Sequence, residues 1–207
     1  MLETVWIPAQ NQQPERILVA LHGLGDSPEG YRWLPDALQL PWLNYVLVQA
    51  PDSYYGGFSW YDLYGDPGPG ILRSRKMLFE LFADLEGKKI LSENITLLGF
   101  SQGCLMSIEM AARYPRRLAG VVGISGYSHE PEKLVRELAP AAARQRILIT
   151  HGSADPLIPI ERVRSQIEVL RGHGLQIDWR EFVKAHTIAG DEEVEVIRDF
   201  VRAGYAA

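Results

Sequence analysis

Short apolar runs alternate with amphipathic, helix-like segments along nearly the whole of this chain. Runs of this kind predict strands at 17–21, 45–48, 95–98, 118–124, 147–150 and 177–182, with an edge strand at 4–7. Helices are predicted to start at Ser27-Pro28-Glu29 and to cover 71–85, 104–114, 131–138, 160–171 and 191–202. The repeated strand–helix order predicts an α/β fold with a mostly parallel central sheet and helices on both faces. A chain of 207 residues is expected to form a single domain across 1–207.

Composition and charge exclude several classes of partner. The net charge is −5 with a pI near 5.6, so no nucleic-acid partner is expected, because such proteins need a basic surface. The single cysteine, Cys104, excludes an internal disulfide and a cysteine-based zinc site. The five histidines lack the spacing of metal ligands, so neither a metal nor a cofactor is expected.

The chain carries no recognisable targeting or membrane segment. Its N-terminus, Met1-Leu2-Glu3-Thr4, lacks the basic and apolar regions of a signal peptide. The apolar runs are far shorter than the roughly 18 residues of a membrane span. We therefore expect a cytoplasmic protein without stable membrane anchoring, while the sequence leaves open whether it is a monomer or a homodimer.

The segment Gly99-Phe100-Ser101-Gln102-Gly103 matches G-x-S-x-G between a predicted strand and a predicted helix. That context is the one a nucleophile elbow requires, so Ser101 is the candidate nucleophile. The alternative is a glycine-rich turn with an inert serine. Ser125 lies in a similar string that lacks the last glycine, and we interpret it as a strand-end serine. Cys104 is expected in the core and not as a nucleophile.

A serine nucleophile needs a histidine base and an orienting acid, which follow in the order acid, then histidine, in chains with this motif. Asp155 lies just after the strand at 147–150, although an Asp before Pro also initiates turns. His186 follows the strand at 177–182, whereas His173 follows a helix. In parallel sheets, ligands bind beyond the carboxyl ends of the strands. Asp155 and His186 are therefore predicted as the acid and the base.

An acyl-transfer site also needs backbone N–H groups for the developing oxyanion. One is expected from the turn after the first long strand, His22-Gly23-Leu24-Gly25-Asp26, where we nominate Leu24. The other is expected from Gln102, directly after the serine. His22 is interpreted as structural, because it precedes the acid in the chain.

The connection at 51–70 is unusually long and rich in aromatics. Long loops are often functional lids or binding loops, although a well-packed surface loop is the alternative. We predict that Trp60, Tyr61, Tyr54 and Phe58 in this loop contact substrate in an open, shallow and partly apolar site.

Four motifs in order resemble the phospholipase/carboxylesterase family of α/β-hydrolases, which includes acyl-protein thioesterases and small carboxylesterases. They are the segments 22–26, Ser59-Trp60-Tyr61-Asp62, 99–103 and 151–159. The resemblance implies an α/β-hydrolase fold without a large cap domain, a triad of Ser101, Asp155 and His186, and an oxyanion hole from Leu24 and Gln102. Ala185 stands where the family usually has glycine.

These features predict a serine esterase that cleaves carboxylic esters of short to medium acyl chains through an acyl-enzyme, with small-molecule substrates. The alternatives are an acyl thioesterase or a lysophospholipase with the same triad. A binding or scaffold protein that kept the fold without catalysis is a third hypothesis, because fold alone does not give function.

Overall fold

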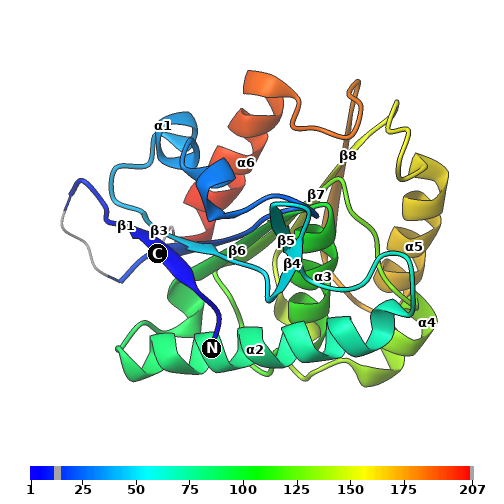
Figure 1. The fold of residues 1–207 in the computed structure, drawn as a ribbon, viewed down its shortest axis with the longest axis horizontal. Coiled ribbons are helices and arrows are strands. Elements are labelled where there is room, and N and C mark those ends of the chain that lie inside the picture. Colours follow the sequence, from blue (N-terminus) through cyan, green and yellow to red (C-terminus); the bar gives the residue numbers. More distant parts are fainter. Residues whose placement is uncertain (12–14, 206–207) are drawn as a thin grey trace.

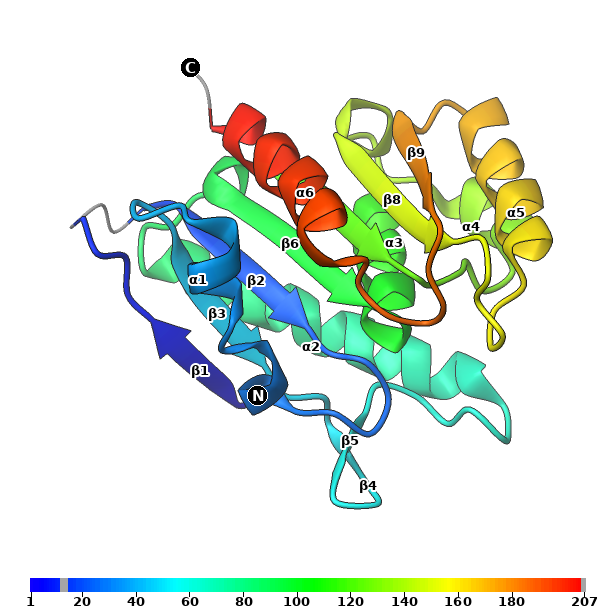
Figure 2. The ribbon, with the colours of Figure 1, turned by 90° about the horizontal axis from the view of Figure 1, so that it is seen from above.

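Seven strands form one central sheet in the computed structural model, which describes residues 1–11 and 15–205 (Figure 1). The strands are β1 (Thr4–Ile7), β2 (Ile17–Leu21), β3 (Asn44–Val48), β6 (Ile95–Phe100), β7 (Gly120–Ile124), β8 (Ile147–Gly152) and β9 (Ile177–Phe182). Their order across the sheet is β1-β3-β2-β6-β7-β8-β9. Only β1 runs antiparallel to its neighbour, so the predicted mostly parallel sheet is confirmed, with β1 and β9 at its two edges (Figure 2).

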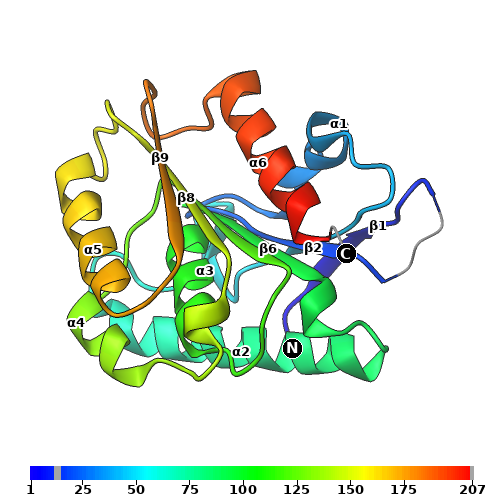
Figure 3. The same cartoon turned by 180° about the vertical axis from the view of Figure 1, so that it is seen from behind.

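Helices cover both faces of this sheet, as predicted (Figures 1 and 3). One face carries α1 (Leu34–Leu38) and α6 (Gly190–Gly204). The other carries α2 (Pro67–Gly87), α3 (Gln102–Arg113), α4 (Pro131–Leu134) and α5 (Ile160–Gly172). Short 3-10 turns lie at Pro28–Tyr31 (η1), Ser92–Asn94 (η2), Val135–Glu137 (η3) and Ala142–Arg144 (η4). Within the described part of the chain, no helix combines the length and apolar character needed to cross a membrane.

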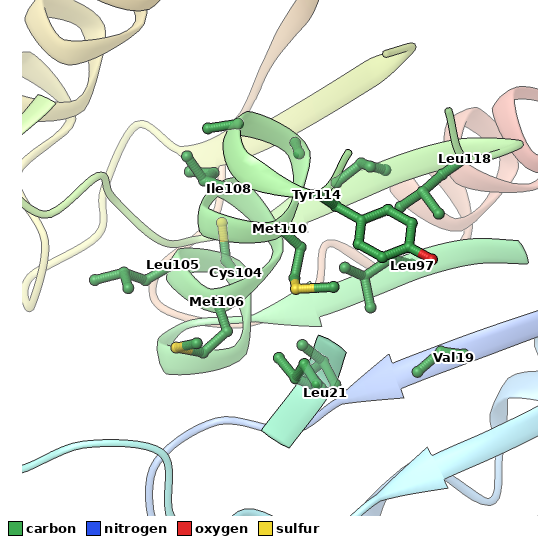
Figure 4. Packing of buried hydrophobic residues seen from close by; sticks show 14 of the residues in the cluster. Val19, Leu21, Leu97, Cys104, Leu105, Met106, Ile108, Met110, Tyr114 and Leu118 are labelled. Carbon is green, nitrogen blue, oxygen red and sulfur yellow. The ribbon is translucent and has the colours of Figure 1, made fainter. Parts of the chain in front are cut away.

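The core is a layer of apolar side chains on each face of the sheet. Every residue of β2 and β3 is buried, as expected for parallel strands covered on both sides. Helix α3 packs on β6, β7 and β2 and contributes Cys104, Met106 and Met110 to this core (Figure 4). Burial raises the pKa of the Cys104 thiol to about 12, so this cysteine is a core residue and not a reactive thiolate.

Several local features differ from the prediction. The segment 51–70 contains a hairpin of β4 (Asp52–Tyr54) and β5 (Gly57–Ser59) that projects beyond the main sheet (Figure 2). Helix α2 begins at Pro67, before the predicted 71, because the Asp66 side chain accepts a hydrogen bond from Gly68 N at 3.0 Å and caps the helix. The helix predicted after Ser27 is only a 3-10 turn without a side-chain cap, and the one predicted at 131–138 divides into α4 and η3.

The register brings the carboxyl ends of four parallel strands to one level. Leu21 pairs with Gly99, Phe100 with Ile124, and Ile124 with Thr150. The segments that follow β2, β6, β7 and β8 therefore leave the sheet side by side, at the edge where ligands bind in such folds.

Candidate active site

Ser101 occupies a strained turn between β6 and α3. Its backbone has φ 54° and ψ −113°, a region that residues with a side chain rarely adopt and that costs on the order of 1–3 kcal/mol. The Ser101 N–H donates to Ile124 O at 2.9 Å, which ties the turn to β7. This conformation presents the hydroxyl at the carboxyl end of the sheet, where the segments after the other strands converge.

Two glycines allow the chain to pass closely around Ser101. A Cβ added to Gly99 would lie 2.1 Å from Gly103 O, and one added to Gly103 would lie 2.2 Å from Leu21 O. Neither contact is compatible with a side chain, so the G-x-S-x-G pattern is explained by the close packing of β6, α3 and β2.

His186 and Asp155 continue from Ser101 in one hydrogen-bonded series. His186 Nε2 lies 2.9 Å from Ser101 Oγ, and His186 Nδ1 lies 2.7 Å from Asp155 Oδ2. The carboxylate can only accept, so Nδ1 carries the proton and Nε2 is free to accept the serine proton. The Phe100 ring packs against the imidazole with centroids 5.1 Å apart. This arrangement can activate a hydroxyl nucleophile.

The Asp155 carboxylate is fully buried and fully hydrogen-bonded. Its Oδ1 accepts from the N–H groups of Leu157 and Ile158 at 2.9 and 3.0 Å. Burial alone would raise the pKa of Asp155, but the hydrogen bond from His186 and the two backbone N–H groups outweigh it and hold the pKa below its usual range. The carboxylate therefore stays ionised and orients the imidazole.

Two residues that line one cavity with Ser101 have a backbone N–H without a partner in the part of the chain that the structure describes. The N–H of Leu24 donates to no acceptor in residues 1–11 and 15–205. Gln102 is the first residue of α3, so its N–H has no carbonyl one turn earlier to bond with. Both belong to residues that line the same cavity as Ser101, and an anionic oxygen there would satisfy them.

The residues around Ser101 enclose a cavity of about 460 Å³. Its apolar walls come from Leu24, Leu63, Phe100, Leu157 and Ile158. Leu63 and Leu157 are exposed at its mouth. An apolar cavity with a few convergent polar groups is typical of a small-molecule site.

Of the four aromatic residues predicted to contact substrate, one lines the cavity and three do not. Tyr61 lines the cavity, although its side chain is almost wholly buried. Trp60, Tyr54 and Phe58 are not among the lining residues. Trp60 is 0% exposed, so it has no surface to offer a substrate, and that interpretation of Trp60 is corrected.

Trp60 instead supports the walls of the site. Its indole N–H donates to His22 O at 2.9 Å, and its backbone N–H donates to Gln102 Oε1 at 2.9 Å. The Gln102 side chain also donates to Tyr61 O at 3.0 Å. These bonds join the segment after β5 to the turns that carry Leu24 and Ser101. Sequence patterns do not reveal this orientation, because it depends on contacts between distant segments.

Two further histidines lie buried beside the site. His22 Nδ1 donates to Gly23 O at 2.7 Å, and its Nε2 accepts from Ala50 N at 3.1 Å. His151 Nε2 donates to Ile158 O at 2.9 Å. Burial lowers the pKa of both histidines, so they are neutral structural groups, as expected for His22.

A buried ion pair holds the ends of the segment 184–189, which carries His186. Lys184 Nζ lies 2.6 Å from Glu193 Oε1, and the two side chains are 2% and 0% exposed. Glu193 Oε2 also accepts from Ala189 N at 2.5 Å. Burial lowers the pKa of Lys184, opposed by the hydrogen bond and charge of Glu193. The two ends of 184–189 are thus fastened to one carboxylate.

Several lining residues were not predicted from the sequence. They are Gly23, Asp26, Leu63, Phe100, Tyr127, Leu157, Ile158 and Arg162. Most of them follow a parallel strand. Their position directly after a predicted strand is therefore the sequence feature from which they could have been predicted. Leu63 follows the β4–β5 hairpin and carried no such signal.

Known proteins similar to this chain are ester and thioester hydrolases. The profile of the phospholipase/carboxylesterase family matches residues 2–204. Acyl-protein thioesterase 1 of Schizosaccharomyces pombe is 33% identical over 155 residues, which are 69% of each chain. Acyl-protein thioesterase 1 of Debaryomyces hansenii is 28% identical over 211 residues, 92% of this chain and 89% of that one.

Among solved structures, esterase PE8 superimposes with a TM-score of 0.87 at 26% identity, covering 97% of this chain and 98% of that one. These similarities confirm the predicted α/β-hydrolase fold. The part of the chain that the structure describes contains no large cap domain over the sheet.

Proposed function

The chain belongs to the phospholipase/carboxylesterase family, and we propose that it is a serine hydrolase that cleaves carboxylic esters of short to medium acyl chains. One domain across 1–207 carries the reaction in this proposal. The observation that supports it most is the unbroken series of hydrogen bonds from Ser101 through His186 to Asp155, which opens on an apolar cavity.

In the proposed reaction, Ser101 Oγ attacks the ester carbonyl carbon while its proton passes to His186 Nε2. The carbonyl oxygen becomes an anion and accepts hydrogen bonds from the N–H groups of Leu24 and Gln102. Collapse of this intermediate breaks the bond to the alcohol, which leaves with the proton from His186. A water molecule then attacks the acyl-enzyme in the same manner, releases the acid and restores Ser101.

The first test is replacement of Ser101 by alanine. We expect kcat/KM on a short neutral ester to fall by a factor on the order of 10⁴–10⁶ while the protein stays folded. Ser125→Ala is the matched control, because Ser125 is a buried strand-end serine whose hydroxyl makes one long contact within the described residues, 3.5 Å to Thr187 O. A fluorophosphonate should label the Ser125→Ala protein but not the Ser101→Ala protein. Activity of Ser101→Ala within tenfold of wild type would contradict the proposal.

The apolar cavity supports the proposed preference for acyl chains of limited length. Each methylene that enters it contributes about 0.8 kcal/mol, or roughly fourfold in kcat/KM. The rate should therefore climb with chain length and then level or fall once the cavity is filled. Leu63→Ser should flatten this climb more than it slows an acetate ester, because Leu63 lines the cavity away from the reacting groups. Equal slowing at all chain lengths would contradict this role of Leu63.

A second candidate function is acyl thioester hydrolysis, which the two acyl-protein thioesterase relatives favour. The same groups would act on a thioester. A matched pair of substrates with one acyl chain, one an oxygen ester and one a thioester, separates the two proposals by the ratio of kcat/KM. A lysophospholipase would instead prefer a lysophospholipid over both.

A further inference from the structure

Arg162 brings an unpaired cation to the wall of the cavity that contains Ser101. It lies in the first turn of α5, is exposed, and lines this cavity. No carboxylate of the described residues pairs with it. The acidic groups nearest along the chain and on β9 are engaged elsewhere, because Glu161 and Glu181 both pair with Arg164 at 2.5 and 2.6 Å.

Tyr127 holds the Arg162 side chain against the cavity wall. The guanidinium carbon of Arg162 lies 4.6 Å from the centroid of the Tyr127 ring, a cation–π contact that limits where the guanidinium can move. The Tyr61 hydroxyl donates to the Tyr127 hydroxyl at 3.4 Å. The hydrogen of the Tyr127 hydroxyl is then free to donate to a ligand.

The order of the strands gives the cavity two electrically different sides. Tyr127 follows β7 and Arg162 follows β8, on one side of Ser101 at the end of β6. Asp26 follows β2 on the other side, where its Oδ1 accepts from Ser27 N at 2.7 Å. Asp155 lies on the Arg162 side, but both of its oxygens are occupied by His186 and backbone N–H groups.

We propose that Arg162 and Tyr127 form a subsite for an anionic group, a carboxylate or a phosphate, carried by the substrate. The proposal rests on the proposed function, since it assigns a substrate feature to the same site. A guanidinium offers a planar fork of donors that matches a carboxylate or a phosphate in two parallel hydrogen bonds. Because Arg162 is exposed, solvent weakens the interaction, and we expect a preference of about two- to fivefold in kcat/KM.

The experiment compares substrates that differ only in a terminal charge. One arm uses acyl esters of equal chain length that end in a carboxylate or in its methyl ester, with a neutral leaving group. The other arm uses one neutral acyl chain on an alcohol with or without a phosphate. The arm that shows the preference tells whether the anion belongs to the acyl or to the alcohol part.

Arg162→Met should abolish the preference for the anionic substrate, measured as the ratio of kcat/KM on the anionic substrate to kcat/KM on its neutral partner in the same variant. Arg144→Met is the matched control, since it removes an exposed cation that does not line the cavity and leaves Arg164 paired with Glu161 and Glu181. It should keep the preference, which excludes a general effect of net charge. Tyr127→Phe should lower the preference only in part, because the ring that supports Arg162 remains.

The proposal is overturned if wild type shows no preference in either arm, or if Arg162→Met and Arg144→Met lower it equally. If the wild type hydrolyses no neutral ester at all, that result would instead contradict the proposed function. The two failures are therefore distinguishable.

Discussion

Replacing Lys184 by methionine tests how the segment around His186 is held in place. The 2.6 Å separation of Lys184 Nζ and Glu193 Oε1 corresponds to an attraction of about 6 kcal/mol at an effective dielectric constant of about 20. Withdrawing both charges from water costs several kcal/mol for each ion, so the intact pair adds little net stability. Lys184→Met removes the attraction and leaves the Glu193 carboxylate buried, with Ala189 N as its remaining partner in the described chain.

We expect the free energy of unfolding of Lys184→Met to fall by about 3–5 kcal/mol. Urea unfolding followed by circular dichroism measures this change, provided that the slope with denaturant is unchanged. Lys88→Met is the matched control, because Lys88 and Asp84 lie 2.8 Å apart but are 56% and 39% exposed. Losing that pair should cost less than about 1 kcal/mol.

The double variant Lys184→Met/Glu193→Leu separates stability from positioning. With no buried charge left, its stability should return to within about 1–2 kcal/mol of wild type. Ala189 N–H loses its acceptor, however, so His186 is held less firmly. We expect kcat/KM to stay about tenfold below wild type, because small misplacements of a reacting group are costly.

Two results would refute this reasoning. If Lys184→Met costs no more than Lys88→Met, the pair is not buried in the manner described. If the double variant has the kcat/KM of wild type, the ion pair does not position His186.

Substitutions at Asp155 and Gly103 and a change of pH probe the acid beside His186, the packing of α3 on β2 and the two buried histidines. Asp155→Asn should lower kcat by about 10⁴, because an amide favours the wrong imidazole tautomer; a change below tenfold in steady-state assays would contradict the proposed role. Gly103→Ala should destabilise the fold by about 1–3 kcal/mol through overpacking against β2, whereas Gly87→Ala, where a Cβ meets nothing within 4 Å, should not. Burial lowers the pKa of His22 and His151, so the unfolded chain takes up protons first in acid. The free energy of unfolding should therefore decrease as the pH falls through about 6.5, by up to about 1.4 kcal/mol per pH unit for each histidine. Equal urea midpoints at pH 7.5 and pH 5.5 would exclude this effect.

The sequence predicted the α/β fold because its strands are short, apolar and separated by helices of clear periodicity. It also placed Ser101, Asp155 and His186 after their own strands, and the structure brings these three side chains into hydrogen-bonding distance. Order along the chain suffices here, because parallel strands all end at one edge of the sheet.

The segment 51–70 could not be predicted in the same way. Its two strands have three residues each, too few for a periodic signal. The burial of Trp60 depends on hydrogen bonds to His22 O and Gln102 Oε1, which are distant in sequence. The buried ion pair of Lys184 and Glu193 could not be predicted either, because charged residues are expected at the surface unless their partner is known.

The position of β9 at the edge of the sheet has a consequence for how this protein loses activity on heating. Ser101 follows β6, which has a strand on either side, whereas His186 follows β9, which pairs only with β8 in the sheet. Elements at an edge open more readily than the centre, with a smaller opening free energy. Hydrogen exchange should therefore be faster in β9 than in β6. On heating, activity should then be lost through local opening of β9, at a temperature where the central strands of the sheet are still folded.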